Sequence, residues 1–139
     1  MTEFVERIAI SAPPARVWQV MADLEAWPQW TPSVERVTTL EWATTGVGSR
    51  FLVMQPKLKP AEFTTTEWTP GAGFTWASHA PGIRSTAEHR IAPNGEGSEV
   101  ELRLRFSGPL AWPVALLHRA LVRRYMRQEA EGLKARAEQ

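Results

Sequence analysis

The stretch EVELRLRFSGPLAWPVALLHRALVRRYMRQEAEGLKARA, residues 99–137, changes its hydrophobic period once, and this change decides the fold class. Apolar and charged residues alternate over residues 99–106, which predicts a strand with one buried and one solvated face. After Ser107-Gly108-Pro109 the apolar residues recur at helical spacing, which predicts one long helix over residues 110–137 with an irregular start or a kink at Pro113. The predicted apolar stripe of this helix consists of Leu110, Val114, Leu117, Leu121 and Tyr125.

Strand-like patterns occupy most of the chain before this stretch. They cover residues 3–11, 34–42, 49–55, 61–68, 74–79 and 83–91, and most are separated by short turns rich in Gly and Pro. Connections of hairpin length predict antiparallel pairing of these strands. In residues 63–68 neither alternating set is clearly the apolar one, so the inward face of that strand stays open.

A tryptophan-rich block follows the first strand and contains Trp18, Trp27 and Trp30. Pro14 fits the first position of a helix because its missing N–H needs no partner there. The apolar residues that follow predict a short helix that ends before Pro28, and then at most one further turn. We interpret Trp18 as a core residue, and Trp27 and Trp30 as the rings that close one end of the fold.

The length and composition predict a single domain spanning residues 1–139, with 43% hydrophobic and 22% charged residues. A chain of this length can bury a core without disulfides or structural metals. The net charge of +1 gives no argument for a nucleic-acid partner. No apolar run approaches the roughly 18 residues of a membrane span, so we expect no stable membrane insertion. The N-terminus lacks the basic and apolar segments of a secretory signal, and we therefore expect a cytoplasmic protein.

The side-chain chemistry of the chain excludes several kinds of site. No cysteine is present, so disulfides and thiolate nucleophiles are excluded. Neither the spacing of His79, His89 and His118 nor the glycine pattern matches a zinc site or a phosphate-binding loop, and we expect no metal and no cofactor. His89 has the parity of an inward-facing residue, which allows two interpretations: a hydrogen-bonded core histidine, or the candidate catalytic acid or base.

Strands flanked by helices at both ends of the chain predict an α+β fold, in which the long helix covers the apolar face of the sheet. Five segments also carry a family resemblance: the strand at residues 4–10, APPARVWQVMADLEAWPQWTP at 12–32, GVGSRF at 46–51, EWTPGAGFTW at 67–76 and EVELRLRFSG at 99–108. They resemble the START-like superfamily, in particular its bacterial polyketide cyclase/dehydrase-type members. The resemblance implies a helix-grip fold, with a curved antiparallel sheet of about seven strands around the C-terminal helix and two short helices after the first strand.

The resemblance also implies an apolar cavity between the sheet and the long helix. Members of the superfamily bind lipids, sterols, polyketides, hormones or similar molecules, a few are aromatase/cyclases, and others recruit a protein partner. The superfamily has no universal catalytic motif, so the resemblance implies a cavity and not a reaction.

Strand parity and the helical stripe predict which side chains line this cavity. Small inward residues, Ser78, Ser85 and Ala87, would leave room in its middle. The predicted ligand-binding residues are Trp27, Trp30, Phe51, Val53, Phe63, Trp76, Ala87, His89, Leu102, Leu117, Leu121 and Tyr125.

Three functions remain open from the sequence. The first is binding of a small, mostly apolar molecule of lipid, polyketide or aromatic type, without a cofactor. The second is a cyclase/dehydratase-type enzyme in which His89, Tyr125 or Glu67 moves protons. The third is a protein-interaction module, and the outward parity of Leu52 and Met54 suggests a homodimer.

The arginines of the long helix allow two interpretations. They are Arg119, Arg123, Arg124 and Arg127. They could meet an acidic partner or a membrane surface, or they could form a solvated face with i, i+4 pairs such as Arg127–Glu131.

Overall fold

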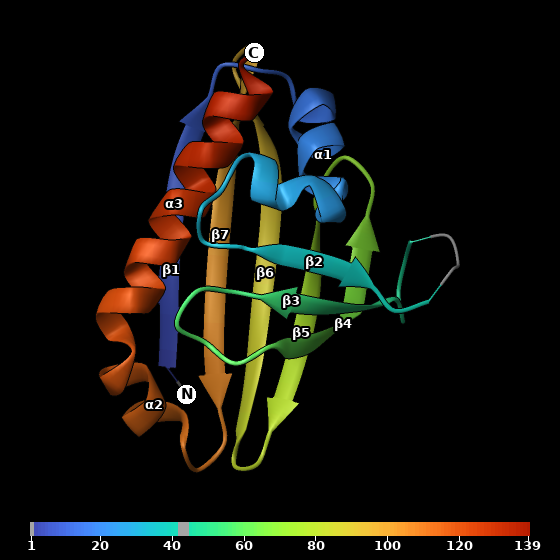
Figure 1. Ribbon diagram of the computed structural model, residues 1–139. Coiled ribbons are helices and arrows are strands. Elements are labelled where there is room, and N and C mark those ends of the chain that lie inside the picture. Colours follow the sequence, from blue (N-terminus) through green and yellow to red (C-terminus); the bar gives the residue numbers. More distant parts are fainter. Residues whose placement is uncertain (1, 42–44) are drawn as a thin grey trace.

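The computed structural model describes residues 2–41 and 45–139, which form a seven-stranded antiparallel sheet gripped against helices (Figure 1). The strands are β1 (Thr2–Ile10), β2 (Arg36–Thr39), β3 (Arg50–Met54), β4 (Ala61–Thr69), β5 (Gly73–Ala80), β6 (Ile83–Asn94) and β7 (Gly97–Ser107). The helices are α1 (Pro14–Ala22), the 3-10 helix η1 (Leu24–Gln29), α2 (Ala111–Leu117) and α3 (Arg119–Ala137). The predicted α+β, helix-grip architecture with two short helices after the first strand is confirmed.

The sheet is strongly curved, with the order β1-β7-β6-β5-β4-β3-β2. Strands β2 to β6 each pair with the next strand along the chain, and β1 pairs with the last strand, β7. Figure 1 shows β2 and β3 running across the long strands β5, β6 and β7, so the two ends of the sheet face different directions. Helix α3 contacts β1 at one edge and also contacts α1, so sheet and helices enclose a common interior.

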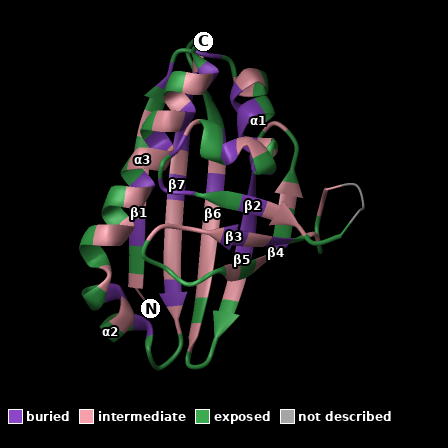
Figure 2. Ribbon diagram, in the orientation of Figure 1, coloured by how far each residue is buried: buried purple, intermediate pink, exposed green. Residues whose placement is uncertain are grey.

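The inward face of the sheet forms the core, as the alternating patterns predicted. Phe74 and Val100 are fully buried there. Figure 2 shows buried segments on strands of the sheet and on α1 and α3. Helix α1 covers one end of this face and buries Met21. Trp18 is partly buried and meets the ring of Trp68 edge-on, with 4.9 Å between ring centroids, so it packs the helix onto the sheet as expected.

The outward face of the sheet is a solvated ladder of opposite charges. Arg7 Nη2 lies 2.8 Å from Glu101 Oε1, and Arg103 Nη2 lies 2.9 Å from the same oxygen. Arg105 Nε lies 2.8 Å from Glu3 Oε2 on the neighbouring strand. Such exposed pairs each contribute little to stability, but they keep this face polar and set the inward register of β1 and β7.

A β-bulge in β4 resolves the strand whose inward face the sequence left open. The register between β4 and β5 shifts between Thr65 and Glu67. Phe63 and Thr65 therefore point inward before the bulge, and Trp68 packs against Phe74 after it, with 5.5 Å between ring centroids. One extra residue reverses the alternation, and this is why neither parity was consistently apolar.

The predicted single C-terminal helix is two helices, α2 and α3. The chain breaks at His118, where φ is −101° and ψ is 9°, rather than at Pro113. Pro113 lies in the first turn of α2, where its missing N–H and its ring disturb no hydrogen bond. The kink predicted at Pro113 is therefore wrong in position.

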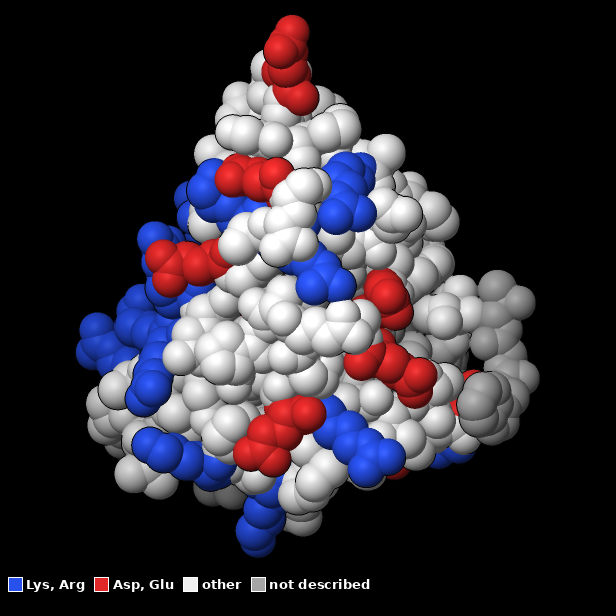
Figure 3. Space-filling view, turned by 45° about the horizontal axis from the view of Figure 1, so that its top comes forward, with Lys and Arg blue, Asp and Glu red and all other residues white. Residues whose placement is uncertain are grey.

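The buried stripe of these helices also differs from the prediction. It consists of Ala111, Ala115, Met126, Ala130, Leu133 and Ala137. The larger apolar residues Leu110, Leu116 and Leu117 are exposed instead. The arginines of α3 named above are exposed, and Figure 3 shows Lys and Arg side chains gathered along this side. Arg127 Nη2 lies 3.3 Å from Glu131 Oε2, which confirms the predicted i, i+4 pair.

Two boundaries differ from the predicted ones. The strand predicted over residues 34–42 is the shorter β2, and Trp42 lies outside the described residues. The first helix ends at Ala22, and the further turn before Pro32 is the 3-10 helix η1, which includes Pro28. Among the helices of the described residues, none is long and apolar enough to cross a membrane.

Candidate functional site

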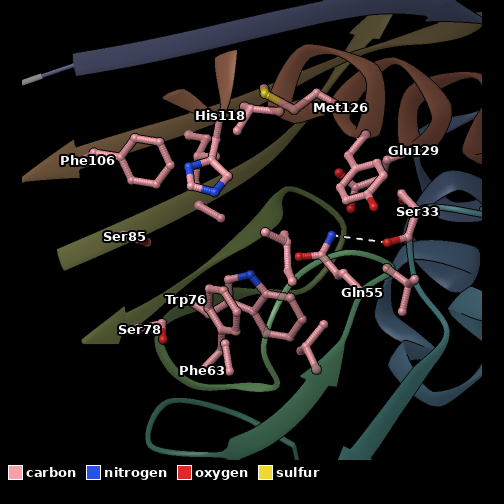
Figure 4. Close-up of a pocket in the computed structure, with 18 of the residues that line it drawn as sticks. Ser33, Gln55, Phe63, Trp76, Ser78, Ser85, Phe106, His118, Met126 and Glu129 are labelled. Atoms are coloured by element: carbon pink, nitrogen blue, oxygen red, sulfur yellow. Dashed lines mark hydrogen bonds between the residues drawn. The ribbon is translucent and has the colours of Figure 1, made fainter. Parts of the chain in front are cut away.

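A cavity of about 550 Å³ lies between the inward face of the sheet, η1 and the two C-terminal helices. Most of its wall is apolar and aromatic, with Trp76 and Phe63 on the sheet and Met126 on α3 (Figure 4). Its size falls within the usual range of small-molecule sites. Ser78, Ser85 and Ala87 line it as predicted, and these small side chains provide space between the larger rings.

Eight of the twelve predicted ligand-binding residues line this cavity: Trp27, Val53, Phe63, Trp76, Ala87, His89, Leu102 and Tyr125. They come from η1, from five strands of the sheet and from α3. The curvature of the sheet is what brings residues so distant in sequence around one space. Their contact with a ligand stays a prediction.

Two predicted residues of the C-terminal helices do not face the cavity. Leu117 is 80% exposed, because α2 ends there and the chain turns at His118. Leu121 is half-buried and lies outside the cavity wall, whereas the next residue, Val122, lines it. At these two positions the prediction was displaced by one residue, because it chose the larger apolar side chains on either side of the break, whereas Val114 and Tyr125 of the predicted stripe do line the cavity.

Two predicted aromatic residues lie behind the wall rather than on it. Phe51 is 2% exposed, and its ring packs on Trp76 with 5.9 Å between centroids. Trp30 packs on Trp27, with 5.3 Å between centroids, and against Gly132 of α3. Both therefore support residues that do line the cavity.

A histidine and a carboxylate meet on the cavity wall. The side chain of His89 on β6 is 4% exposed and that of Glu129 on α3 is 16% exposed. His89 Nε2 lies 3.6 Å from Glu129 Oε1, and Nδ1 lies 3.3 Å from the carbonyl oxygen of Phe74. The imidazole also stacks on the ring of Phe74, with 4.2 Å between centroids and 10° between planes, and this fixes its orientation.

Glu129 is a site residue that the sequence analysis missed. A signal existed, because Tyr125 was predicted to point inward and Glu129 lies four residues later, on the same face of the helix. Because Glu129 is charged, the sequence alone favoured placing it on the solvated face of the helix. The register of α3 against β1 and β7 decides otherwise.

Further polar groups gather near the loop between β3 and β4. The Gln55 amide donates to the Ser33 carbonyl oxygen over 3.2 Å (Figure 4). Tyr125 donates its phenolic hydroxyl to the carbonyl oxygen of Pro56 and so ties α3 to this loop. Leu58, in the same loop, lines the cavity and is 36% exposed, so this loop forms part of the cavity mouth.

The other polar groups of the cavity lie towards its opposite end. Ser78 and Ser85 face each other across β5 and β6, and His118 lies on the same side in Figure 4. Ser85 and His89 are four residues apart on β6, which corresponds to about 13 Å along the strand. The cavity therefore has an apolar middle and hydrogen-bonding groups at both ends.

The three histidines of the chain all border the cavity. His79 does so although it was predicted to have the opposite parity. His118 Nδ1 lies 3.1 Å from the carbonyl oxygen of Val114, so one of its nitrogens is already used within the helix. In the part of the chain that the structure describes, no three His, Asp or Glu residues come together as metal ligands would.

Leu52 and Met54, suggested as a homodimer surface, alternate with the buried Phe51 and Val53 as their parity predicted. Leu52 and Met54 are half-buried. A group of exposed apolar side chains lies on and beside α2 and consists of Leu110, Trp112, Leu116 and Leu117. A homodimer stays a prediction.

Comparison with known proteins places the fold among well-defined relatives. A family model described as "Polyketide cyclase / dehydrase and lipid transport" matches residues 1–138. The chain is similar to the crystal structure of TTHA0849 from Thermus thermophilus, with 25% identity, a TM-score of 0.72, and coverage of 98% of this chain and 97% of that one. A search of curated proteins found no match.

Two further solved structures are similar in fold. The ZhuI aromatase/cyclase from Streptomyces sp. R1128 has 18% identity and a TM-score of 0.79, over 99% of this chain and 93% of that chain. Ara h 8.0201 has 13% identity and a TM-score of 0.72, over 98% and 97% of the two chains. At these identities the likeness shows a shared fold.

Proposed function

Because this chain belongs to the polyketide cyclase/dehydrase and lipid transport family, we propose that it binds a small, mostly apolar molecule in the cavity between its sheet and its C-terminal helices. One observation carries the proposal, namely the cavity of about 550 Å³ with a largely apolar wall that includes the rings of Trp27, Phe63 and Trp76. A space of this size and lining gains free energy when an apolar ligand displaces water from it.

The distribution of polar groups narrows the class of ligand. Glu129 and His89 lie at one end of the cavity, and Ser78, Ser85 and His118 lie towards the other. A ligand that satisfies both ends is elongated and carries oxygen atoms near each end of an apolar body. Flat aromatic or polyketide-type molecules have this pattern, whereas a simple hydrocarbon does not.

Native mass spectrometry of the purified protein tests the proposal directly. We expect a co-purified small molecule, or else a rise in melting temperature with members of a panel of lipids, sterols and aromatic polyketides. Quenching of tryptophan fluorescence by the same compounds, reduced in Trp76→Phe, would locate binding at the cavity. A protein free of ligand from several expression hosts, with no thermal shift across the panel, would refute it.

A second candidate function is acid–base catalysis of the cyclase/dehydratase type. The observation that favours it is the His89–Glu129 pair, because a group that can exchange a proton faces a space where a ligand would lie. Deuterium exchange at the central carbon of a 1,3-diketone such as 1-phenylbutane-1,3-dione measures this chemistry in isolation. The C–H bond breaks with transfer of the proton to the pair, the enolate forms, and deuterium returns to the carbon.

The two candidate functions differ in one outcome of that exchange experiment. A catalyst accelerates exchange above the buffer rate and loses this acceleration in His89→Gln, whereas a binding protein binds the diketone without accelerating exchange. The matched control is His79→Gln, which changes an exposed histidine at the cavity mouth. Acceleration that survives in His89→Gln would remove the pair from the mechanism.

A further inference from the structure

We infer that His89 and Glu129 hold one proton between them and that this pair recognises a hydroxyl group of the phenol or enol class on the ligand. The inference rests on the proposed binding function and specifies the chemistry at one end of the cavity. It follows from which atoms face the two imidazole nitrogens and from the walls around them.

A backbone carbonyl group determines whether Nδ1 of His89 carries a proton. Nδ1 lies 3.3 Å from the carbonyl oxygen of Phe74, which can only accept a hydrogen bond. An unprotonated Nδ1 would place its lone pair against that oxygen. In the observed orientation, with the imidazole stacked on Phe74, Nδ1 therefore carries a proton.

The second nitrogen faces a group that also accepts. Nε2 lies 3.6 Å from Glu129 Oε1, close enough for an ion pair and slightly long for a hydrogen bond. If Nδ1 alone were protonated and Glu129 were ionised, two lone pairs would face each other in a largely buried place. Both contacts become favourable when the pair holds one additional proton, either on Nε2 or on the carboxyl group.

The surroundings of the pair strengthen this requirement. Three aromatic rings surround the imidazole, those of Trp27, Phe74 and Trp76, and their centroids lie 5.5, 4.2 and 5.9 Å from its own. Among the described residues, His89 is the only basic side chain within ion-pair distance of Glu129.

A shared proton of this kind selects for a particular ligand group. A hydroxyl can accept a hydrogen bond from His89 Nε2–H and donate one to Glu129, so it fits between both partners. A methyl ether or a ketone can only accept and leaves the carboxylate without a donor. The acidic hydroxyl of a phenol or an enol donates most strongly, and its planar body suits the rings of Trp27 and Trp76.

Nitrogen NMR of the histidine rings at pH 7 tests the proton without any ligand. In the unaltered protein we expect protonated Nδ1 and an Nε2 shifted towards the protonated value. In Glu129→Gln we expect Nδ1 to stay protonated and Nε2 to become unprotonated. The inference is overturned if Nδ1 is unprotonated in the unaltered protein, or if Nε2 is equally unprotonated with and without the carboxylate.

Binding of 2-naphthol and 2-methoxynaphthalene tests the recognition. These probes differ by one methyl group and have the same aromatic body. We expect 2-naphthol to bind at least about tenfold more tightly, because the ether leaves a buried acceptor unpaired. The preference should fall to less than about threefold in Glu129→Gln and in His89→Gln, and it should be unchanged in Glu131→Gln, an exposed carboxylate on the same helix.

The outcomes separate this inference from the proposed function. Equal affinity for both naphthalenes, or a preference that persists in Glu129→Gln, overturns hydroxyl recognition and leaves apolar binding intact. Failure of both compounds to bind contradicts the proposed function for aromatic ligands of this size and removes hydroxyl recognition with it. Because each preference is a ratio measured within one variant, a general loss of stability does not imitate the expected result.

Discussion

Gly132 of α3 lies directly against the backbone of Trp30, so that a Cβ atom at position 132 would be 1.9 Å from the Trp30 carbonyl oxygen. This close approach holds the end of η1 on the helix and keeps the ring of Trp30 against Trp27, which lines the cavity. A single glycine therefore determines how tightly the tryptophan-rich corner closes onto the fold.

Replacing Gly132 with Ala should destabilise the protein, although alanine favours helix formation. We expect a loss of about 1–3 kcal/mol from the displaced backbone, partly offset by about 1 kcal/mol of helix propensity. Chemical denaturation measures the difference. Gly46→Ala is the control, because a Cβ there would have no atom of the described residues within 4 Å, and the stability of this variant should hardly change. Equal effects of the two substitutions would show that the contact with Trp30 is unimportant.

Filling the cavity at Ala87 should abolish ligand binding without unfolding the protein. Ala87 lies on β6 opposite Trp76 of β5, and its small side chain borders the central space. We expect Ala87→Phe to lower affinity for 2-naphthol by at least about tenfold, because the ring takes up volume that the ligand needs. Ala92→Phe, at an exposed position of the same strand, should bind as the unaltered protein does. Tryptophan quenching titrations give the affinities.

Removing the Tyr125 hydroxyl should release the loop between β3 and β4. Tyr125→Phe loses the hydrogen bond to the Pro56 carbonyl oxygen, which costs about 1 kcal/mol of stability. We also expect faster association and dissociation of the ligand, since this loop forms part of the mouth. Stopped-flow fluorescence measures both rates, and unchanged rates in a destabilised variant would limit the role of Tyr125 to stability.

The charge ladder on the outward face should make stability depend on pH in the acid range. The hydrogen bond from Arg105 lowers the pKa of Glu3 below its ordinary value of 4.5. A carboxyl group whose pKa is lower in the folded state contributes stability above the ordinary pKa and loses it as pH falls through the folded-state pKa. Melting temperatures should be measured from about pH 2 to about pH 7. The difference between the unaltered protein and Glu3→Gln should be present at neutral pH and should disappear only at the acid end of this range.

The effect of Glu3 should be small and sensitive to salt, because the side chains of the pair are solvent-exposed. Glu96→Gln, which changes an exposed carboxylate in the turn between β6 and β7, provides the comparison. Melting curves of Glu3→Gln and the unaltered protein that stay parallel down to the lowest pH would contradict the assignment of the lowered pKa.

Several elements of the fold follow from local patterns in the sequence. The alternation around Leu102 and Leu104 places β7 and its buried face correctly, and Pro14 marks the start of α1. In β4 the same approach left the inward face open, because the bulge between Thr65 and Glu67 adds a residue that periodicity cannot locate. The prediction used the two-residue alternation alone. One inserted residue moves every later inward-facing side chain to the opposite alternating set.

The candidate site was predictable where a strand sets the direction of its side chains. Trp76, Ala87 and His89 lie on the cavity because alternate residues of a strand share a face. Leu117 was misplaced because the helix breaks at His118, and the sequence contains no glycine or proline at that point to mark the break. Glu129 was missed because its inward position depends on how α3 rotates against the sheet.

The sequence by itself determined the order of the elements, the antiparallel sheet and the aromatic character of the interior, because these depend on local propensity and on periods of about two and 3.6 residues. Only the tertiary structure decided that the sheet curves enough to leave an open space beside Trp76, and that Glu129 of α3 faces His89 of β6 across it. Those relationships depend on the packing angle and register between distant segments, which no local pattern of residues encodes.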